Sequence, residues 1–180
     1  MATHFGPDNT PNGFMSKTMT VFLLPLVLLA LHWVCIFSGK YMPDNVGSSK
    51  LGMFALWIIP AASVFSGLVI YGYALNEQLD VGRMALTFVG ALLLVVGNYM
   101  PKVTRNWVVG IKIPTTLADE DNWNRTHRFA APVWVIGGLA MLVCGLTGIL
   151  TGVLAAVLLI AMVLLPVGYS LMLAAKAKKK

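Results

Sequence analysis

The sequence has little charge and few cysteines. Only 11% of its 180 residues are charged, whereas soluble domains carry about 25%. This balance argues against a soluble globular protein. It also argues against nucleic-acid binding, because the basic residues lie at the ends of apolar runs and not on a polar surface. Cys35 and Cys144 both lie within apolar runs, and two cysteines are too few for a disulfide framework or a Cys-rich metal site.

Long apolar runs make up most of the chain, 58% of which is hydrophobic. Because about 20 apolar residues span the hydrocarbon core of a bilayer, the runs predict an all-α integral membrane protein, a five-helix transmembrane bundle. The turn-rich residues 1–17 are expected to form an extracytoplasmic loop, and residues 101–128 a structured cytoplasmic segment. Residues 176–180 form a basic cytoplasmic tail. The predicted spans are at about 18–38, 51–75, 84–100, 129–150 and 151–175.

The distribution of Lys and Arg predicts the orientation in the membrane. Eleven of the thirteen lie in residues 40–50, in the 101–128 segment or in the C-terminal tail, which five spans place on one side. Only Lys17 and Arg83 fall on the other side. Since cytoplasmic loops carry the excess of Lys and Arg, we expect the N-terminus outside and the C-terminus in the cytoplasm. Cys35 and Cys144 would then differ in depth by about 15 Å, too far for a disulfide.

Residues 98–128 are the most polar stretch between the apolar runs. They hold five of the thirteen Lys and Arg residues and three of the seven carboxylates. Pro101 is expected to end the third span, with Lys102 and Arg105 next to the helix C-terminal dipole and the lipid phosphates. Gly110 allows a turn or a close backbone approach, and Pro114 closes a short extended piece.

A short interfacial helix is expected to follow and to bend into the fourth span. Thr116 and Asp119 fit the [ST]-x-x-[DE] capping pattern. Helical spacing places Leu117, Glu120, Trp123 and His127 on one face.

The acidic residues 119–121 invite a catalytic or metal-binding interpretation. They are consecutive, so they radiate around a helix and do not converge on one point. The sequence contains no HExxH motif, no Cys pair, and no nucleophile–base pair that can be named. We interpret the carboxylates as matching the helix dipole, with Arg125, His127 and Arg128 at the other end. No enzymatic activity, metal or cofactor is expected.

His32 and Asn98 are polar residues inside predicted spans, and both are expected to face inward. His32 could be a neutral imidazole bonded to a backbone carbonyl, or it could share a polar floor with Asn98 beneath the cytoplasmic segment. Helix kinks are predicted at Pro25, Pro60 and Pro166. Small residues at helix-packing spacing predict close helix contacts: Ser63 with Gly67, Gly90 with Gly97, and Gly138 with Gly145.

The polar segment resembles the signature of the SdpI family of bacterial membrane proteins, which are named for immunity to a sporulation-delay toxin. The signature reads N-x-x-P-K, then N-x-x-x-G-I-[RK]-x-P-W-T-L, then W-x-x-T-x-R. Here it begins at Asn98, continues from Asn106 through Pro114 to Leu117, and ends at Arg128. Thr115 replaces the usual tryptophan, so an aromatic contact expected in the family is missing.

The N-terminal residues HFGPDNTPNGFMSK resemble a loop that follows the first span in many six-span members. On this resemblance the first span is expected to be absent, or the start site to lie downstream of the true one. The resemblance implies a protein of the bacterial inner membrane. Its partners would be the lipid bilayer, a peptide toxin outside and a transcriptional repressor inside, with no direct contact to nucleic acid.

The leading hypothesis is a non-enzymatic protein of toxin-immunity and signalling type, whose 98–128 segment binds a protein or lipid partner. The alternative is a small transporter or a lipid- or peptide-handling protein, although the spans offer few polar residues for a route. An intramembrane hydrolase lacks any nucleophile–base or metal spacing. The residues expected to form or shape the site are Asn98, Pro101, Lys102, Arg105, Asn106, Gly110, Pro114, Thr116, Trp123, Thr126, His127 and Arg128.

Overall fold

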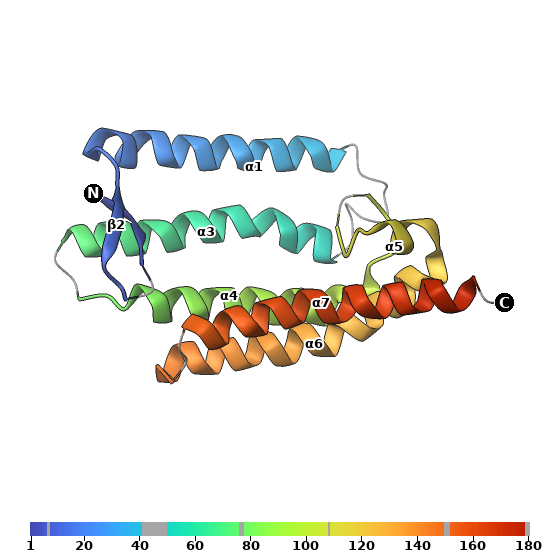
Figure 1. Ribbon diagram of the computed structural model, residues 1–180. Helices are drawn as coiled ribbons and strands as arrows, with labels where there is room; N and C mark the ends of the chain where they lie inside the picture. The colour runs from blue at the N-terminus through green and yellow to red at the C-terminus, as the bar shows by residue number, and fades with distance from the viewer. Residues whose placement is uncertain (7, 41–49, 76–77, 108, 150–151, 179–180) are drawn as a thin grey trace.

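The computed structural model describes residues 1–180 except 7, 41–49, 76–77, 108, 150–151 and 179–180. Most of the predicted 40–50 link, the expected hairpin turn near 150 and the last two tail residues therefore lie outside the described residues. Helices dominate the chain (Figure 1). In order, the elements are β1 (Ala2–Phe5), β2 (Pro11–Phe14), η1 (Met19–Leu23), α1 (Leu24–Lys40), α3 (Lys50–Ala74), α4 (Val81–Tyr99), η2 (Met100–Lys102), α5 (Pro114–Ala118), α6 (Glu120–Thr147) and α7 (Gly152–Ala177).

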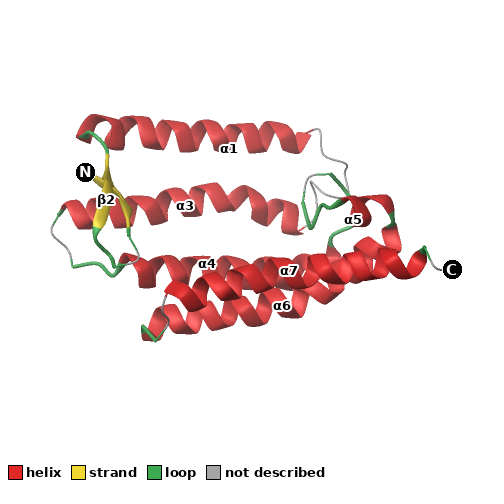
Figure 2. Cartoon of the chain, in the orientation of Figure 1, coloured by secondary structure: helices red, strands yellow, loops and turns green. Residues whose placement is uncertain are grey.

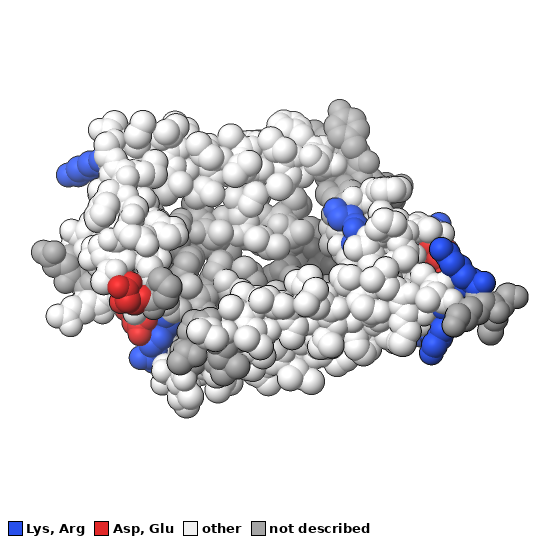
Figure 3. Space-filling view, viewed as in Figure 1, with Lys and Arg blue, Asp and Glu red and all other residues white. Residues whose placement is uncertain are grey.

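The described residues include five helices that are long and apolar enough to cross a membrane. At 1.5 Å per residue, a helix of about 20 residues covers the roughly 30 Å of the hydrocarbon core. Figure 3 shows Lys, Arg, Asp and Glu at the two ends of the molecule, with an uncharged belt between them on the face in view. The prediction of an all-α membrane protein is confirmed. We call the two ends the hairpin end, which carries β1 and β2, and the α5 end.

The N-terminal residues form a β-hairpin, which corrects the expectation of a plain loop over residues 1–17 (Figure 2). Gly6 donates its amide to the carbonyl of Thr10 at 2.8 Å at the turn of the hairpin. Asn9 in this turn has φ 62°, a left-handed conformation that asparagine tolerates. The hairpin is anchored to the bundle by an edge-to-face contact between Phe5 and Tyr73, whose ring centroids are 5.0 Å apart. Asn9 adds hydrogen bonds to Asp80 and to the amide of Gly82, each 2.8 Å long. These long-range contacts stabilise strands that sequence periodicity did not indicate.

Two predicted helix boundaries differ from the structure. The third span begins earlier than residue 84, because Asp80 caps α4 by accepting the amide of Arg83 at 3.0 Å. The helix before the fourth span is not separate, since α6 runs unbroken from Glu120 to Thr147. The short helix of the polar segment is instead α5, which ends one residue before the N-cap of α6, Asp119.

Helices α4 and α6 pack so closely that their glycines meet backbone atoms. A Cβ on Gly90 would lie 2.5 Å from the amide nitrogen of Leu142, and one on Gly138 would lie 2.6 Å from that of Leu94. Gly97 and Gly145 are similarly crowded by the partner helix. Close contacts predicted at these four glycines are confirmed, whereas a Cβ on Gly67 would meet only its own helix neighbour Tyr71. Among the described cysteines, Cys35 and Cys144 are both free, as expected.

Pro166 in α7 shows how a proline is accommodated within a span. A proline has no N–H, so the carbonyl four residues earlier, that of Met162, loses its helix partner. The indole Nε1 of Trp134 on α6 donates to this carbonyl at 2.8 Å. The neighbouring helix thus satisfies the freed group, as a membrane interior requires.

Candidate functional site

Trp123 is the centre of the polar segment at the α5 end. Its side chain is fully buried, at 0% exposure, on the first turns of α6. The indole Nε1 donates to the carbonyl of Val103 at 2.7 Å. Val103 packs on the ring, and the partly buried Tyr99 and Leu117 pack around this pair. A single tryptophan therefore holds the chain after η2 against the start of α6.

His127 lies one turn beyond Trp123 and stacks on it, with ring centroids 4.1 Å apart. Its Nε2 accepts the amide of Ile111 at 2.9 Å, and its Nδ1 lies 2.8 Å from the carbonyl of Trp123. Because an amide can only donate and a carbonyl only accept, this geometry assigns the proton to Nδ1 and a neutral ring. His127 thus connects residues 109–113 to α6.

Glycine is the only residue type that fits at position 110, beneath these two rings. It has φ +125°, a conformation that L side chains rarely adopt. A Cβ here would lie 2.6 Å from Nε2 of His127 and 2.9 Å from the ring of Trp123. The close backbone approach expected at this glycine is therefore present, and it is made against two aromatic rings.

Asn106 fixes the loop between η2 and residues 109–113. Its side chain is buried, at 5% exposure. Nδ2 donates to the carbonyls of Thr104 and Val109 at 2.7 and 3.0 Å, and Oδ1 accepts the amide of Val109 at 2.7 Å. The side chain binds its own loop and is not offered to a ligand.

Two prolines and Thr116 shape the rest of the segment. Pro101 lies inside η2 directly after α4, and Pro114 opens α5 at a position where its missing N–H costs nothing. The hydroxyl of Thr116 accepts the amide of Ile113 at 3.1 Å. The expected cap from Thr116 onto Asp119 is wrong, since Asp119 caps α6 itself by accepting the amide of Asp121 at 3.0 Å.

A buried polar cluster joins α5, α6 and α7 at this end. Asn122 donates from Nδ2 to the carbonyl of Ser170 at 3.0 Å, and its Oδ1 accepts the hydroxyls of Ser170 and Thr126 at 2.6 and 3.0 Å. Thr115 lies 2.7 Å from the Ser170 hydroxyl. Thr126 was predicted as a site residue. Asn122 and Ser170 were not predicted, although a serine in an otherwise apolar span was a usable signal.

The cations of the segment remain at its surface. Lys102, Arg105 and Arg128 are exposed. Arg105 donates to the carbonyl of Leu117 at 3.2 Å, and Nζ of Lys102 lies 5.2 Å from the centre of the Tyr99 ring. Trp107 is 78% exposed beside them in the chain. The segment therefore combines a closed interior with a basic surface that carries one prominent aromatic.

The two intramembrane polar residues do not form a shared floor in the described structure. Asn98 is exposed, which corrects the expectation that it faces inward. Its neighbour Gly97 faces α6, and one residue on a helix turns the next side chain by about 100°. His32 is half-buried, and its Nδ1 makes no hydrogen bond with any described residue.

The acidic residues at the start of α6 do not belong to a metal-binding group in the described part of the chain. No three His, Cys, Asp or Glu side chains gather there in a way that could hold a metal ion. Asp119, Glu120 and Asp121 are all exposed at the start of α6, and Asp121 pairs with Arg125 at 3.3 Å. These carboxylates lie at the positive end of the helix dipole, where they stabilise α6.

Parts of the chain are similar to known protein families. Residues 102–170 match the model of the SdpI/YfhL protein family, and residues 1–29 match the model described as Domain of unknown function (DUF1648). The chain is 29% identical over 140 residues to the Immunity protein SdpI of Bacillus subtilis (strain 168), an alignment that covers 75% of this chain. It spans 64% of the length of that relative. No solved structure matches.

The SdpI/YfhL match includes most of the polar segment and continues through α6 into α7. It therefore contains Trp123, His127 and Gly110, the three residues whose packing closes the segment. The resemblance to the SdpI family indicated by the sequence motifs is thereby confirmed for this multi-pass membrane protein.

Proposed function

We propose that this chain is a toxin-immunity protein of the bacterial cell membrane and that its α5 end is a cytoplasmic binding surface for a protein partner. The observation that carries the proposal is the construction of the 103–127 segment. Trp123, His127 and Asn106 use their polar groups inside the segment, while Lys102 and Arg128 remain exposed. A segment folded this firmly keeps its surface groups in place before a partner arrives, which reduces the ordering cost of binding.

The similarity to an immunity protein supports the direction of the proposal. A peptide toxin would act from outside, and the partner would be met in the cytoplasm. The α5 end carries most of the basic residues, and under the positive-inside rule this supports a cytoplasmic α5 end and an outer hairpin end. The signal would then travel along the helices that join the two ends, with α4 and α6 in the closest contact.

The surface favours a protein partner with an acidic face. Its cations attract acidic groups, and the exposed Trp107 offers apolar surface. Trp and Arg are enriched among the few residues that contribute most of the binding energy at protein interfaces. A lipid-only role would require the same cations merely to contact phosphates, for which a fixed geometry is unnecessary.

The test is protection of a toxin-sensitive bacterium by the expressed chain, followed by capture of a cytoplasmic protein on the chain. Lys102→Gln, Arg105→Gln and Arg128→Gln together are expected to abolish partner capture and to weaken protection. The matched control changes Arg125, Lys176 and Lys178 to Gln, which removes the same charge from the same end. Full capture and protection by the first triple variant would overturn the proposed site. Absence of protection by the unaltered chain would overturn the proposed function.

A further inference from the structure

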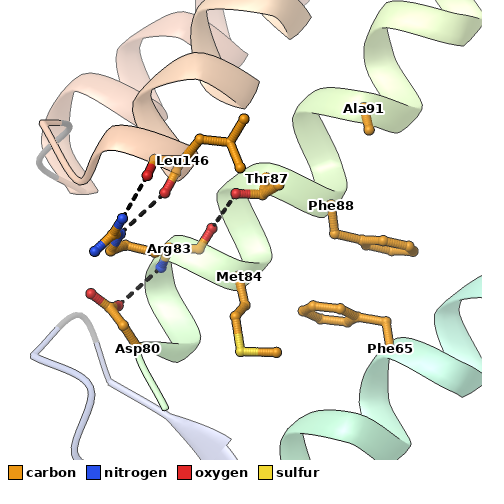
Figure 4. A pocket seen from close by; sticks show the side chains of 9 residues that line it. Phe65, Asp80, Arg83, Met84, Thr87, Phe88, Ala91 and Leu146 are labelled. Atoms are coloured by element: carbon orange, nitrogen blue, oxygen red, sulfur yellow. Dashed lines mark hydrogen bonds between the residues drawn. The ribbon is translucent and has the colours of Figure 1, made fainter.

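The hairpin end contains an apolar cavity that the proposed function does not use. A cavity of about 600 Å³ lies between α3, α4 and the C-terminal turn of α6 (Figure 4). Cavities of 300 to 1,000 Å³ are typical of ligand sites. Most of its lining is apolar, and the residues that shape it are Phe65, Met84, Thr87, Phe88, Ala91 and Leu146.

Two stacked aromatic rings form one wall of this cavity. Phe65 of α3 and Phe88 of α4 lie with their ring centroids 4.5 Å apart and their planes 6° from parallel. Met84 lies beside them on α4, one turn before Phe88 (Figure 4). Methionine adapts its shape to different apolar contacts and is common at binding surfaces. Ala91 leaves space where a larger side chain would fill it.

The one cation in the lining is already engaged. Arg83 donates from Nε to the carbonyl of Gly145 at 3.1 Å and from a terminal nitrogen to that of Leu146 at 2.6 Å. These carbonyls belong to the last turn of α6, which is the negative end of its helix dipole. The charge of Arg83 is therefore offset by α6, and its fork closes the cavity at that side.

A carboxylate at the rim keeps one oxygen available. Oδ1 of Asp80 accepts the amide of Arg83 and the side chain of Asn9, whereas Oδ2 makes no hydrogen bond with any described residue. The amide of Arg83, together with Asn9 and the Arg83 charge, holds the pKa of Asp80 below its usual value, so the group is ionised at neutral pH.

This charge pattern selects between two occupants. A phospholipid would bring an anionic phosphate to a rim that carries the Asp80 carboxylate and a cation, Arg83, that is already engaged by α6, which is unfavourable. We propose that the cavity binds a peptide segment with apolar side chains and a basic group, the apolar side chains packing against the wall formed by Phe65, Met84 and Phe88 and the basic group meeting Asp80. This inference deepens the proposed function and rests on it, since the toxin itself is the peptide that would be recognised at the outer face.

Photo-crosslinking of the full chain in phosphatidylcholine nanodiscs tests the site. The probe is a short Leu/Ala peptide with one Lys near its end and a diazirine side chain beside it, and a matched peptide carries Gln in place of Lys. Cross-links from the Lys peptide are expected at Met84 and Phe88. Ala91→Trp fills the cavity and is expected to reduce them several-fold, whereas Val64→Trp, which adds a ring at an exposed position of α3, is expected to leave them unchanged.

The charge is tested by Asp80→Asn, which retains an N-cap acceptor for α4 because asparagine caps helices as well as aspartate does. It is expected to weaken cross-linking of the Lys peptide about fivefold, equivalent to about 1 kcal/mol, and to leave the Gln peptide unaffected. Asp119→Asn makes the same change at the N-cap of α6 and is the control. Equal labelling by both peptides, or labelling that Ala91→Trp does not reduce, would overturn the proposal and indicate that lipid fills the cavity.

Protection assays separate this inference from the proposed function. Loss of protection in Ala91→Trp but not in Val64→Trp supports both. Cross-linking that behaves as expected in a chain that never protects supports the peptide site and refutes the immunity function. If the Ala91→Trp and Asp80→Asn variants protect as well as the unaltered chain, the peptide site is refuted and the immunity function still stands.

Discussion

Gly110→Ala is the substitution that most directly perturbs the closed interior of the polar segment. The residue has φ +125°, and holding an L residue in such a conformation costs about 1–3 kcal/mol. Its Cβ would also lie 2.6 Å from Nε2 of His127. The imidazole must then move away from the amide of Ile111, which leaves a buried donor unpaired at a further cost of about 1–3 kcal/mol. We expect a total loss of about 2–6 kcal/mol.

The measurement is unfolding of the purified protein in detergent, monitored by tryptophan fluorescence and by proteolysis of the polar segment. Gly168→Ala is the matched control, because a Cβ there would meet no atom within 4 Å and alanine favours a helix interior by up to about 1 kcal/mol. The control is expected to be unchanged or slightly more stable. If Gly110→Ala unfolds at the same point as the unaltered protein, the close approach beneath His127 does not exist as described.

Three further predictions follow from individual contacts. Trp134→Phe removes the donor to the Met162 carbonyl and should destabilise the protein by about 1–3 kcal/mol. In a Pro166→Ala background this cost should fall, because the alanine N–H restores the helix hydrogen bond to Met162. An equal cost in both backgrounds would contradict this assignment. Ser170→Ala removes the hydroxyl that donates to Oδ1 of Asn122 and keeps the Ser170 carbonyl that accepts from Nδ2, so we expect a loss of about 1 kcal/mol in detergent unfolding, with no loss from Ser66→Ala at a partly buried position in α3. Lys102→Cys should react with a membrane-impermeant maleimide only after the cells are opened, and Lys17→Cys in intact cells; the reverse pattern would refute the orientation.

The fold was predictable from the sequence because its strongest signals are local. Five apolar runs predict five membrane helices, and glycines such as Gly90 and Gly138 predict where those helices approach. The hairpin was missed because the anchors of its turn, Asp80 and Tyr73, are far away in the sequence. The start of α6 was misplaced because a polar helix that continues into an apolar one has no boundary in its hydrophobic pattern.

The sequence predicted that residues 98–128 fold into a structured segment, but it predicted less about the contacts inside that segment. Trp123, His127, Asn106 and Gly110 were identified as site-forming. Their function inside the segment depends on which groups meet, and spacing alone does not show that Ile111 donates to His127. The exposure of Asn98 likewise depends on which face of α4 packs on α6. Thr115, which replaces the tryptophan typical of the family, bonds to Ser170, a role that only the placement of α7 reveals.

The central claim is that the described residues between 103 and 113, which leave out residue 108, are a preformed part of a binding surface. Amide hydrogen exchange of the full chain in nanodiscs tests it most directly, without any partner. The hydrogen bonds from the amides of Val109 and Ile111 to Asn106 and His127 predict exchange in this segment that is slowed to the range of the first turns of α6, and faster exchange after His127→Ala. Exchange at the rate of an unfolded peptide in the unaltered protein would contradict the claim.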